Sequence, residues 1–447
     1  MLNRLDLRHV DRDVIAHLPR PEVAGDEPVA AVRSILAAVR EQGDEALLRF
    51  TREFDGIEME SLRVSAEQLT AAFERTPAEV REALAVAAGR IEAFHRTQVH
   101  GETTYGDGGY IRSFNVAVDR AGCYVPGGRA AYPSTVLMTA IPAKVAGVGS
   151  VVVCVPPDRT TGAVTDVTLA ACLVAGVDEV YAVGGAQAIA AMAYGTDTIA
   201  AVDVICGPGN KYVAIAKREV AGVTGIASAF AGPSEIVVVA DSSAPAAFAA
   251  VDVVVQAEHG PDGLAWLVTW DEAVADAVSA EVERITEASP RRDEIVSTLA
   301  TAGYAVLCRD AEQAMEVANA IAPEHLQIMT ADPEALVGLV RNAGAIFCGP
   351  WSPASMGDYV AGPSHVLPTD GTARFSSALT VADFQKHHHV ITFTAEQSAA
   401  LAPVVDVLAS AEGLDAHALS ARMRLEAAAA VNPNATHPNA AQAGERP

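Results

Sequence analysis

The stretch that decides the fold is residues 150–185, "SVVVCVPPDRTTGAVTDVTLAACLVAGVDEVYAVGG". It begins with a Val-rich run (150–157), continues with an Ala-rich helical pattern (164–176) and ends in a second apolar run before two glycines (177–185). Continuous Val and Ile runs separated by helix-length segments are typical of parallel strands buried on both faces. We therefore predict a parallel βαβ unit here.

The same alternation of strands and helices extends in both directions along the chain. A first series surrounds the opening stretch, with predicted strands at 115–128, 150–157, 177–185 and 201–209. A second series has predicted strands at 235–241, 264–270, 303–308, 325–330 and 345–349. Predicted helices alternate with these strands, at 132–147, 164–176, 186–195, 210–222, 244–258, 271–288, 310–321 and 333–343. This pattern predicts an α/β protein with two Rossmann-like, doubly wound domains.

The remaining segments are predicted to be helical or irregular. Residues 28–52 and 64–100 have the periodicity of amphipathic helices, and a helical tail covers 395–430. Residues 350–385 are rich in loop-forming residues, and residues 432–447 have a composition typical of disorder.

Composition excludes several classes of protein. The chain has 447 residues, so about three domains are expected. Its 31 basic and 56 acidic residues give a net charge of −25, which argues against a nucleic-acid partner. The N-terminus lacks the apolar core of a signal peptide, and apolar runs are too short to span a membrane. We expect a cytoplasmic protein without a membrane partner.

The six cysteines are far apart and form no C-x-x-C pair. Several lie in apolar, strand-like runs. We interpret them as buried, reduced thiols of a cytosolic protein rather than as disulfides.

Three glycine turns follow strands in the first series: "VPGG" (125–128), "VGGAQA" (183–188) and "CGPGNKY" (206–212). Backbone N–H groups at the start of the following helix can bind phosphate groups. None of these turns is the G-x-G-x-x-G motif, and each alone is compatible with an ordinary loop. Three together at the carboxyl ends of neighbouring strands favour a nucleotide-binding crevice.

Polar side chains end an apolar helix in "VDVVVQAEHGPDG" (251–263). Gln256 and His259 lie three residues apart, so a helix presents them on one face. Imidazole is a common zinc ligand, whereas an amide oxygen is a weaker one. The pair alone fits either a helix cap or half of a metal site.

Two further clusters combine acids and histidines. Glu324 and His325 follow a proline in "IAPEHLQI" (321–328), where a helix meets a strand. They suit proton transfer at neutral pH but also a structural role. The Gly- and Pro-rich stretch "PASMGDYVAGPSHVLPT" (353–369) carries Asp358 and is either a functional loop or a solvated turn.

Two more histidine-bearing segments lie near the C-terminus. "SAEGLDAHA" (410–418) carries Glu412 and His417 on predicted surface helices. "KHHHV" (386–390) resembles a metal-binding run, but consecutive strand residues point to alternate faces. Its three histidines therefore cannot all bind one ion, and we interpret the run as mainly structural or solvent-facing.

Taken together, the motifs resemble those of the histidinol dehydrogenase family. The similarity is carried, in order between residues 120 and 418, by "GCYVPGGRAAYPSTVLMTAIPAKVAGV", "VGGAQAIAAMAYGT", "ICGPGNKYVAIAK", "AGPSEI", "VVQAEHGPDG", "APEHLQI", "GPWSPASMGDYVAGPSHVLPT" and "EGLDAHALS". The resemblance implies a homodimeric enzyme of the last steps of histidine biosynthesis, with one Zn²⁺ per subunit. Such an enzyme oxidises L-histidinol through L-histidinaldehyde to L-histidine and uses two NAD⁺ in succession.

The resemblance also implies a role for particular residues of this sequence. The catalytic acid and base are Glu324 and His325. The implied metal ligands are Gln256, His259, Asp358 and His417. The implied substrate contacts are Ser234, Gln256, His259, His325, Asp358, Glu412 and His417, and we expect Glu412 and His417 to be donated across the dimer interface. The implied dinucleotide contacts are Tyr124, Gln187 and Asn210.

We divide the chain into five parts on this basis. They are an N-terminal extension (1–22), a first α/β domain with the metal and catalytic residues (23–123 and 230–378), a second α/β domain with the NAD-binding turns (124–229), a C-terminal helical dimerisation domain (379–431) and a disordered tail (432–447). The extensions at both ends are predicted to be small and helical.

Three other interpretations remain open at this point. A zinc hydrolase with Glu324 as its base would explain the ligands but not the glycine turns. A two-lobed binding protein would need no turnover. A thiohemiacetal on a cysteine is a rival route for aldehyde oxidation, but the motifs around Cys123 and Cys154 contain no His or charged residue that would activate a thiolate. The missing G-x-G-x-x-G also predicts a loosely held, exchangeable NAD⁺.

Overall fold

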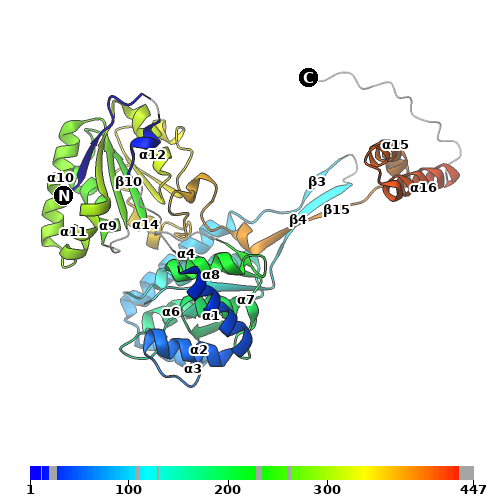
Figure 1. Cartoon of the computed structure of the whole chain (residues 1–447), viewed down its shortest axis with the longest axis horizontal. Helices are drawn as coiled ribbons and strands as arrows, with labels where there is room; N and C mark the ends of the chain where they lie inside the picture. The colour runs from blue at the N-terminus through cyan, green and yellow to red at the C-terminus, as the bar shows by residue number, and fades with distance from the viewer. Residues whose placement is uncertain are drawn as a thin grey trace. The chain divides into compact units, whose positions relative to one another are not determined.

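The computed structural model describes residues 1–11, 13–19, 28–106, 110–127, 130–227, 234–258 and 263–431. The chain divides into two compact units, the first made of 1–99 and 117–386 and the second of 100–116 and 387–447. The first unit contains two α/β domains, each built on its own six-stranded sheet (Figure 1). The predicted fold class, two Rossmann-like α/β domains, is confirmed.

We call the first of these sheets sheet A. Its strand order is β1-β12-β11-β10-β13-β14, and every pairing in it is parallel. The strands are β1 (Asn3–Asp6), β10 (Glu235–Ala240), β11 (Leu264–Thr269), β12 (Gly303–Leu307), β13 (His325–Met329) and β14 (Ala345–Cys348). From β10 the chain first adds β11 and β12 on one side and then crosses over to add β13 and β14 on the other, so the switch point of this doubly wound sheet lies between β10 and β13.

The central strands β10, β11 and β13 of sheet A are buried on both faces because they are apolar at consecutive positions. Ile236 and Val238 contribute to one core cluster, whereas Val237 and Val239 contribute to the other. One face is covered by α9 (Ala246–Ala257), α10 (Glu272–Ala288) and α11 (Arg292–Ala302). The other is covered by α12 (Ala311–Ile321) and the short helices η1 (Val14–His17) and α13 (Glu334–Val337), as Figure 1 shows for α12.

We call the second sheet sheet B. Its order is β2-β7-β6-β5-β8-β9, and it is parallel except for β2, which pairs antiparallel with β7. The strands are β2 (Arg63–Val64), β5 (Arg120–Tyr124), β6 (Ser150–Val155), β7 (Glu179–Ala182), β8 (Val204–Cys206) and β9 (Gly225–Ile226). Its five parallel strands repeat the order of β10 to β14, so both domains have the same basic topology.

Helices also cover both faces of sheet B. One face carries α1 (Val29–Gln42), α2 (Asp44–Phe50) with its π-helical extension η2 (Thr51–Asp55), α7 (Gly185–Tyr194) and α8 (Lys211–Val220). The other carries α3 (Ala66–Arg75), α4 (Ala78–Arg96), α5 (Pro133–Ala146) and α6 (Asp166–Val174). The stretch 150–185 therefore forms the βαβ unit that its sequence predicts.

The sheets group the chain differently from the predicted division. The predicted division places residues 63–64 and 120–123 in the first α/β domain, but they lie in sheet B, and helices α1 to α4 pack on the same sheet. Helices α1 to α4 bury their apolar faces against sheet B, and this packing places them in the same domain as that sheet. The segment 3–6 of the predicted N-terminal extension is strand β1 of sheet A, paired with β12.

The loop-rich segment 350–385 contains short helices. These are α14 (Ala354–Tyr359), η3 (Thr372–Arg374) and η4 (Val381–Phe384). Val366, Leu379 and Phe384 are buried in the core cluster of sheet B that also holds α5. This segment therefore extends from the last strand of sheet A to the core of the other α/β domain.

The second unit combines a small sheet with a helical hairpin. The sheet has the order β15-β4-β3, with β3 (Thr103–Tyr105), β4 (Ile111–Ala117) and β15 (Gln385–Ile391). The hairpin consists of α15 (Ala395–Ala411) and α16 (Asp415–Val431), which pack against each other. The predicted helical tail is confirmed, and the predicted disordered tail lies outside the described residues. Among the described helices, none has the length and apolar character needed to cross a membrane.

Candidate active site

Glu324 and His325 lie at the amino end of sheet A. Helix α12 ends at Ile321, and Ala322 then takes a left-handed conformation with φ 54° that turns the chain into β13. His325 is the first residue of that strand and lies in register with Ile236 of β10. His325 is 3% exposed and Glu324 7%, so both side chains are buried at the switch point of the sheet.

The imidazole of His325 is in contact with polar atoms at both nitrogens. Its Nε2 lies 3.2 Å from Asp358 Oδ1, and its Nδ1 lies 3.2 Å from the backbone oxygen of Glu235. Nδ1 is also 3.6 Å from Glu324 Oε2. Since a carbonyl oxygen only accepts, Nδ1 carries a proton, and Nε2 is the nitrogen that can lose one. The ring stacks on Phe347 with 5.9 Å between centroids.

Burial and charge shift the pKa values of this pair. Burial raises the pKa of Glu324 to about 7, against the opposing effects of His325 and of the Glu235 N–H, which donates to Glu324 Oε2 over 3.1 Å. Burial lowers the pKa of His325, but the charges of Glu324 and Asp358 outweigh it and raise the pKa to about 9. The buried Glu324 and the partly exposed Asp358, both next to one imidazole, make the site attractive to a cation.

Glu235 is a residue at this site that the sequence interpretation missed. It is 3% exposed, and burial together with the charge of Glu324 raises its pKa to about 8. The signal was present in "PSEI", where an acidic residue begins an otherwise apolar strand. Ser234, a predicted substrate contact, precedes it and donates a hydrogen bond that lowers the pKa of Glu324. Ser234 therefore lies beside the acid–base pair.

Gln256 comes to the same site from the C-terminal end of α9. Its side chain is 1% exposed, and its Nε2 is 3.4 Å from His325 Nδ1. Its Oε1 is a buried oxygen with no hydrogen-bond partner. His259, predicted on the same helix face, lies outside the described residues. Glu258 is the residue that caps α9.

Asp358 reaches His325 from α14, in the segment 353–369 that the sequence singles out. Its backbone oxygen is 2.8 Å from His365 Nδ1, and His365 Nε2 is 3.3 Å from Thr135 Oγ1 of α5. Ser364 Oγ donates to the backbone oxygen of Met138 over 2.9 Å. The position of Asp358 is thus linked through His365 to helix α5.

No group of three or more His, Cys, Asp or Glu side chains within the described ranges is placed to hold a metal ion. Of the predicted ligands, Gln256 does not belong to these four residue types, and His259 lies outside the described residues. His325 is contacted at Nε2 by Asp358 and at Nδ1 by Gln256, so both side chains lie at the same site. These two provide oxygen donors of the kind that divalent cations bind.

The predicted dinucleotide residues lie at the carboxyl end of sheet B. Tyr124 ends β5, is 4% exposed and accepts a hydrogen bond from the Gly185 N–H at the start of α7, over 3.0 Å. Gln187 follows on α7, with a buried Oε1 that has no hydrogen-bond partner. Asn210 caps α8, and its Oδ1 accepts from the backbone N–H groups of Tyr212 and Val213. Burial raises the pKa of Tyr124 to about 12, so its hydroxyl stays protonated.

The turn after β8 depends on a glycine conformation. Gly207 has φ 101°, and a Cβ built there would lie 2.1 Å from the Tyr124 backbone oxygen. Lys217 of α8 is fully buried, and its ammonium donates to the backbone oxygen of Gly207. The turn therefore packs directly against the end of β5.

Glu412 and His417 belong to the second unit. Glu412 caps the end of α15, and His417 lies in the first turn of α16, so both flank the bend of the hairpin. Both side chains are exposed. They form a group on their own unit.

The cysteines are free thiols, and all but Cys348 are buried. Cys123 Sγ lies 3.7 Å from Cys206 Sγ in the core of sheet B. Burial raises the pKa of Cys154 well above its usual range. A buried thiol with a raised pKa is a poor nucleophile, so this environment disfavours the thiohemiacetal route at Cys154.

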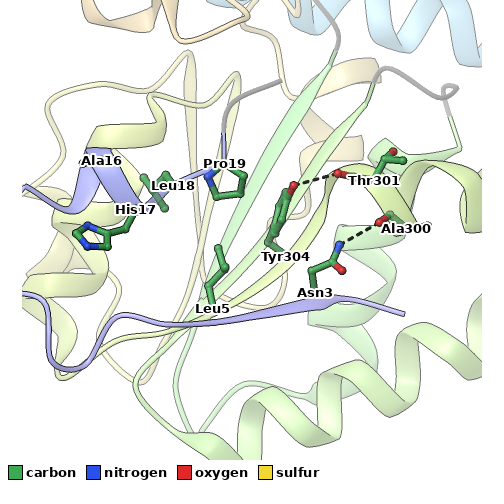
Figure 2. A pocket seen from close by; sticks show the side chains of 9 residues that line it. All are labelled: Asn3, Leu5, Ala16, His17, Leu18, Pro19, Ala300, Thr301 and Tyr304. Atoms are coloured by element: carbon green, nitrogen blue, oxygen red, sulfur yellow. Dashed lines mark hydrogen bonds between the residues drawn. The ribbon is translucent and has the colours of Figure 1, made fainter. Parts of the chain in front are cut away.

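A pocket also lies on the α/β domain of sheet A, away from the acid–base pair. Figure 2 shows Asn3 and Tyr304 in its wall, where they donate to the backbone oxygens of Ala300 (3.1 Å) and Thr301 (2.9 Å). Leu5 and His17 also line it. Its lining includes none of the predicted site residues, and we do not assign the candidate site to it.

Comparisons with known proteins agree with the motifs. The family model described as histidinol dehydrogenase matches residues 18–425. A protein of Synechococcus sp. named histidinol dehydrogenase is 50% identical over 399 residues, which is 88% of this chain and 92% of the relative. Another from Pseudomonas aeruginosa, with the same name, is 47% identical over 424 residues, 94% of each chain.

A solved structure agrees at the level of the fold. The crystal structure of histidinol dehydrogenase from Elizabethkingia anophelis superposes with a TM-score of 0.90 at 31% sequence identity. The match covers 95% of this chain and 98% of that one. Both sheets and their surrounding helices are therefore shared with that structure.

Proposed function

The chain belongs to the histidinol dehydrogenase family, and from this premise we propose that it oxidises L-histidinol to L-histidine with NAD⁺ as the electron acceptor. The reaction consists of two hydride transfers, the first giving L-histidinaldehyde and the second L-histidine. The observation that carries the proposal is the buried His325, held between Glu324 and Asp358 at the switch point of sheet A. An oxidation of an alcohol needs such a base to accept its proton.

Zinc fits the donor atoms of this site. Gln256 Oε1 is buried without a hydrogen-bond partner, which is costly for a polar atom unless a ligand completes it. We propose that Gln256, His259 and Asp358 hold the ion together with His417 of the partner subunit. A bound zinc ion would supply positive charge next to the carbinol oxygen and fix the orientation of the substrate's amine and imidazole nitrogens.

His325 is proposed as the general base of the first oxidation. Its Nδ1 donates to the Glu235 backbone oxygen, so Nε2 is the atom that accepts the alcohol proton as hydride leaves for NAD⁺. The charges of Glu324 and Asp358 both favour the protonated ring. When Asp358 takes part in ligand binding, its share of this influence weakens and the pKa of His325 falls.

Glu324 is proposed as the base of the second oxidation. The aldehyde must first add water, and Glu324 takes the proton of that water while His325 takes the proton of the hydrate as the second hydride leaves. Burial raises the pKa of Glu324 to about 7, which suits a base that must both accept and release a proton near neutral pH. Ser234 and Glu412 are proposed to orient the substrate.

NAD⁺ is proposed to bind at the carboxyl end of sheet B, in contact with Tyr124, Gln187 and Asn210. Helices α7 and α8 begin at Gly185 and Lys211, and the positive ends of their dipoles suit its phosphates. No G-x-G-x-x-G loop encloses the dinucleotide. A loosely held cofactor fits a reaction in which two NAD⁺ are used in turn while the aldehyde stays bound.

We propose a homodimer in which each site receives Glu412 and His417 from the partner subunit. The hairpin that carries both residues exposes large apolar side chains, which is typical of a surface that another chain covers. The most exposed of them are Val404 (56%), Val407 (69%), Leu408 (59%), Leu419 (51%) and Met423 (59%).

The direct test is formation of NADH by the full-length chain given L-histidinol and NAD⁺. We expect two NADH for each L-histidine formed, no reaction after treatment with a chelator, and recovery when Zn²⁺ is added back. A zinc hydrolase would form no NADH, and a binding protein would bind histidinol without turnover. Either result would refute the proposed oxidation.

A complementation experiment tests the shared site. The His417→Ala and His325→Ala variants should each be inactive, because each lacks one part of every site. After dissociation and random reassociation, about half of the dimers are mixed and have one complete site, so about a quarter of the wild-type activity should return. If the mixture stays inactive although mixed dimers are detected by mass spectrometry, His417 and His325 of different chains do not share a site.

A further inference from the structure

Strand β15 of the second unit carries three consecutive histidines, and two of them share a face. His387 and His389 are two residues apart, so their side chains lie on the same side of the strand, while His388 lies on the other. The rings of His387 and His389 are 4.8 Å apart between centroids and nearly perpendicular. All three side chains are exposed. The pair is therefore accessible from solvent within its own unit.

Both rings are fixed by hydrogen bonds to the neighbouring strand β4. His387 Nδ1 lies 2.7 Å from Asn115 Oδ1, and His389 Nδ1 lies 3.0 Å from Ser113 Oγ. Because an amide oxygen only accepts, His387 Nδ1 carries a proton, and its Nε2 has a lone pair. A hydroxyl can accept in the same way from His389. This is the arrangement in which an outer hydrogen bond orients a metal-binding imidazole.

The ring spacing matches that of two imidazoles on one ion. With a metal–nitrogen bond of about 2.0–2.1 Å, a ring centroid lies about 3.2 Å from the ion, so two rings at angles between 90° and the tetrahedral angle are about 4.5–5.2 Å apart. The observed 4.8 Å falls within this range. The spacing of the two rings is thus compatible with both binding one ion.

We propose that His387 and His389 form a peripheral binding site for a divalent transition-metal ion of the Ni²⁺, Cu²⁺ and Zn²⁺ class, held by the two Nε2 atoms and by water. These ions prefer imidazole nitrogen, unlike Mg²⁺ or Ca²⁺. The part of the chain that the structure describes offers no third His, Cys, Asp or Glu to complete the site. Binding is therefore weaker than at a closed four-ligand site, and the ion exchanges readily.

His388 provides a matched control in the same strand. It is also exposed but stacks on Phe114 on the opposite face, with 5.8 Å between ring centroids. A change at His388 removes the same functional group from the same strand without touching the pair. If the ion binds surface histidines in general, substitution of any of the three histidines should reduce binding. If it binds the proposed site, only substitution of His387 or His389 should do so.

The experiment is a calorimetric titration of the zinc-loaded, dialysed, full-length chain with Ni²⁺, on protein without a histidine tag. We expect one additional Ni²⁺ per wild-type chain and per His388→Gln chain. The His387→Gln and His389→Gln variants should each lose this binding, and Asn115→Ala should weaken it by about 10- to 100-fold, as measured for outer-shell partners of metal ligands. Circular dichroism and thermal unfolding verify that the variants are folded.

Two outcomes would overturn the proposal. Equal loss in all three histidine variants would mean that the ion binds exposed histidines without a defined site. Unchanged binding in His387→Gln and His389→Gln would place the ion elsewhere. The Asp358→Asn variant separates this site from the proposed catalytic one, because it should retain the additional Ni²⁺ even if it no longer oxidises histidinol.

Discussion

Sheets A and B have the same order of parallel strands, but their candidate functional residues lie at opposite ends. In sheet B, Tyr124 and Asn210 follow the carboxyl ends of strands, as is usual for ligands of doubly wound sheets. In sheet A, Glu235 and His325 begin strands, so that site lies at the amino ends. Strand order alone therefore does not determine which edge of such a sheet binds a ligand.

The helices explain why opposite edges suit different ligands. Helices run back against the strands, so their N-termini meet the carboxyl edge and their C-termini meet the amino edge. A helix N-terminus favours anions, and the proposed ligand at sheet B is a dinucleotide with two phosphates. A helix C-terminus favours cations, and the end of α9 presents Gln256 where zinc is proposed.

The two edges also differ in what forms them. The edge of sheet B is shaped by backbone, with Gly207 packed against Tyr124. The edge of sheet A is formed by buried ionisable side chains whose pKa values are shifted by one another. Changes at sheet A should therefore affect turnover, whereas changes at sheet B should affect binding of NAD⁺.

The largest expected effect is that of His325→Gln. Loss of the general base should lower turnover by about 10²- to 10⁴-fold, while zinc content, measured by mass spectrometry of the metal, falls little. The variant His95→Gln is a suitable control, because His95 is also a fully buried histidine but lies on α4. If His325→Gln loses zinc and activity in equal proportion, His325 acts on metal binding rather than on proton transfer.

A smaller effect is expected for Gly207→Ala at the edge of sheet B. The added Cβ would clash with the Tyr124 backbone oxygen, so the turn before Asn210 must move. We expect the KM for NAD⁺ to rise at least about tenfold and the free energy of unfolding to fall by about 2–4 kcal/mol, with turnover at saturating NAD⁺ little changed.

Gly176→Ala is the matched control for that change. Gly176 lies in the same domain and also has a positive φ, 64°, but a Cβ there meets no atom within 4 Å. Only the backbone cost, about 1–2 kcal/mol, is expected, without a change in the KM for NAD⁺. Equal KM values in the two variants would show that the clash at Tyr124 does not govern NAD⁺ binding.

Much of the fold could be predicted because its signals are local. The Val-rich strands and Ala-rich helices of 150–185 specify buried parallel strands through their composition. Strand β1 could not be predicted, since Asn3–Asp6 is polar and becomes a strand only by pairing with β12, about 300 residues later. The assignment of residues 29–96 to sheet B depends likewise on distant packing.

The candidate site was predictable only in part for the same reason. Glu324 and His325 are adjacent in sequence, and the motif reveals them. Glu235 lies next to Glu324 and His325 because β10 pairs with β13, and this pairing cannot be read from a single sequence. The pairing of His387 with Asn115 also depends on two strands separated by 272 positions in the chain.

Lys217 gives a pH-dependent test of the edge of sheet B. Burial lowers its pKa from 10.5 to about 8, so above pH 8 the folded chain releases this proton while the unfolded chain still binds it. This contribution to stability therefore rises with pH between about 8 and 10.5. Urea titrations measure the unfolding free energies of wild type and of Lys217→Met. Between pH 7 and 9.5, the unfolding free energy of wild type should increase by about 2 kcal/mol relative to that of the variant.

Lys144→Met should show no such shift relative to wild type. Lys144 lies in the same domain, but its side chain is 30% exposed and pairs with Asp178. If the difference in unfolding free energy between wild type and Lys217→Met does not change across this pH range, Lys217 stays charged in the folded chain. The turn at Gly207 then binds an ammonium group throughout.

The smallest effect is expected for Tyr124→Phe, which removes one hydrogen bond at the edge of sheet B. The Gly185 N–H then loses its acceptor, the Tyr124 hydroxyl oxygen 3.0 Å away. The start of α7, which carries Gln187, is therefore less firmly positioned. A neutral hydrogen bond is worth about 0.5–1.5 kcal/mol, so the KM for NAD⁺ should rise by about 2- to 12-fold without a change in zinc content. Tyr181→Phe removes another buried hydroxyl, one that donates to Glu179 within sheet B, and should leave the KM unchanged. If Tyr124→Phe instead lowers turnover at saturating NAD⁺, the edge of sheet B contributes to the chemical step, and the division between a binding edge and a reacting edge does not hold.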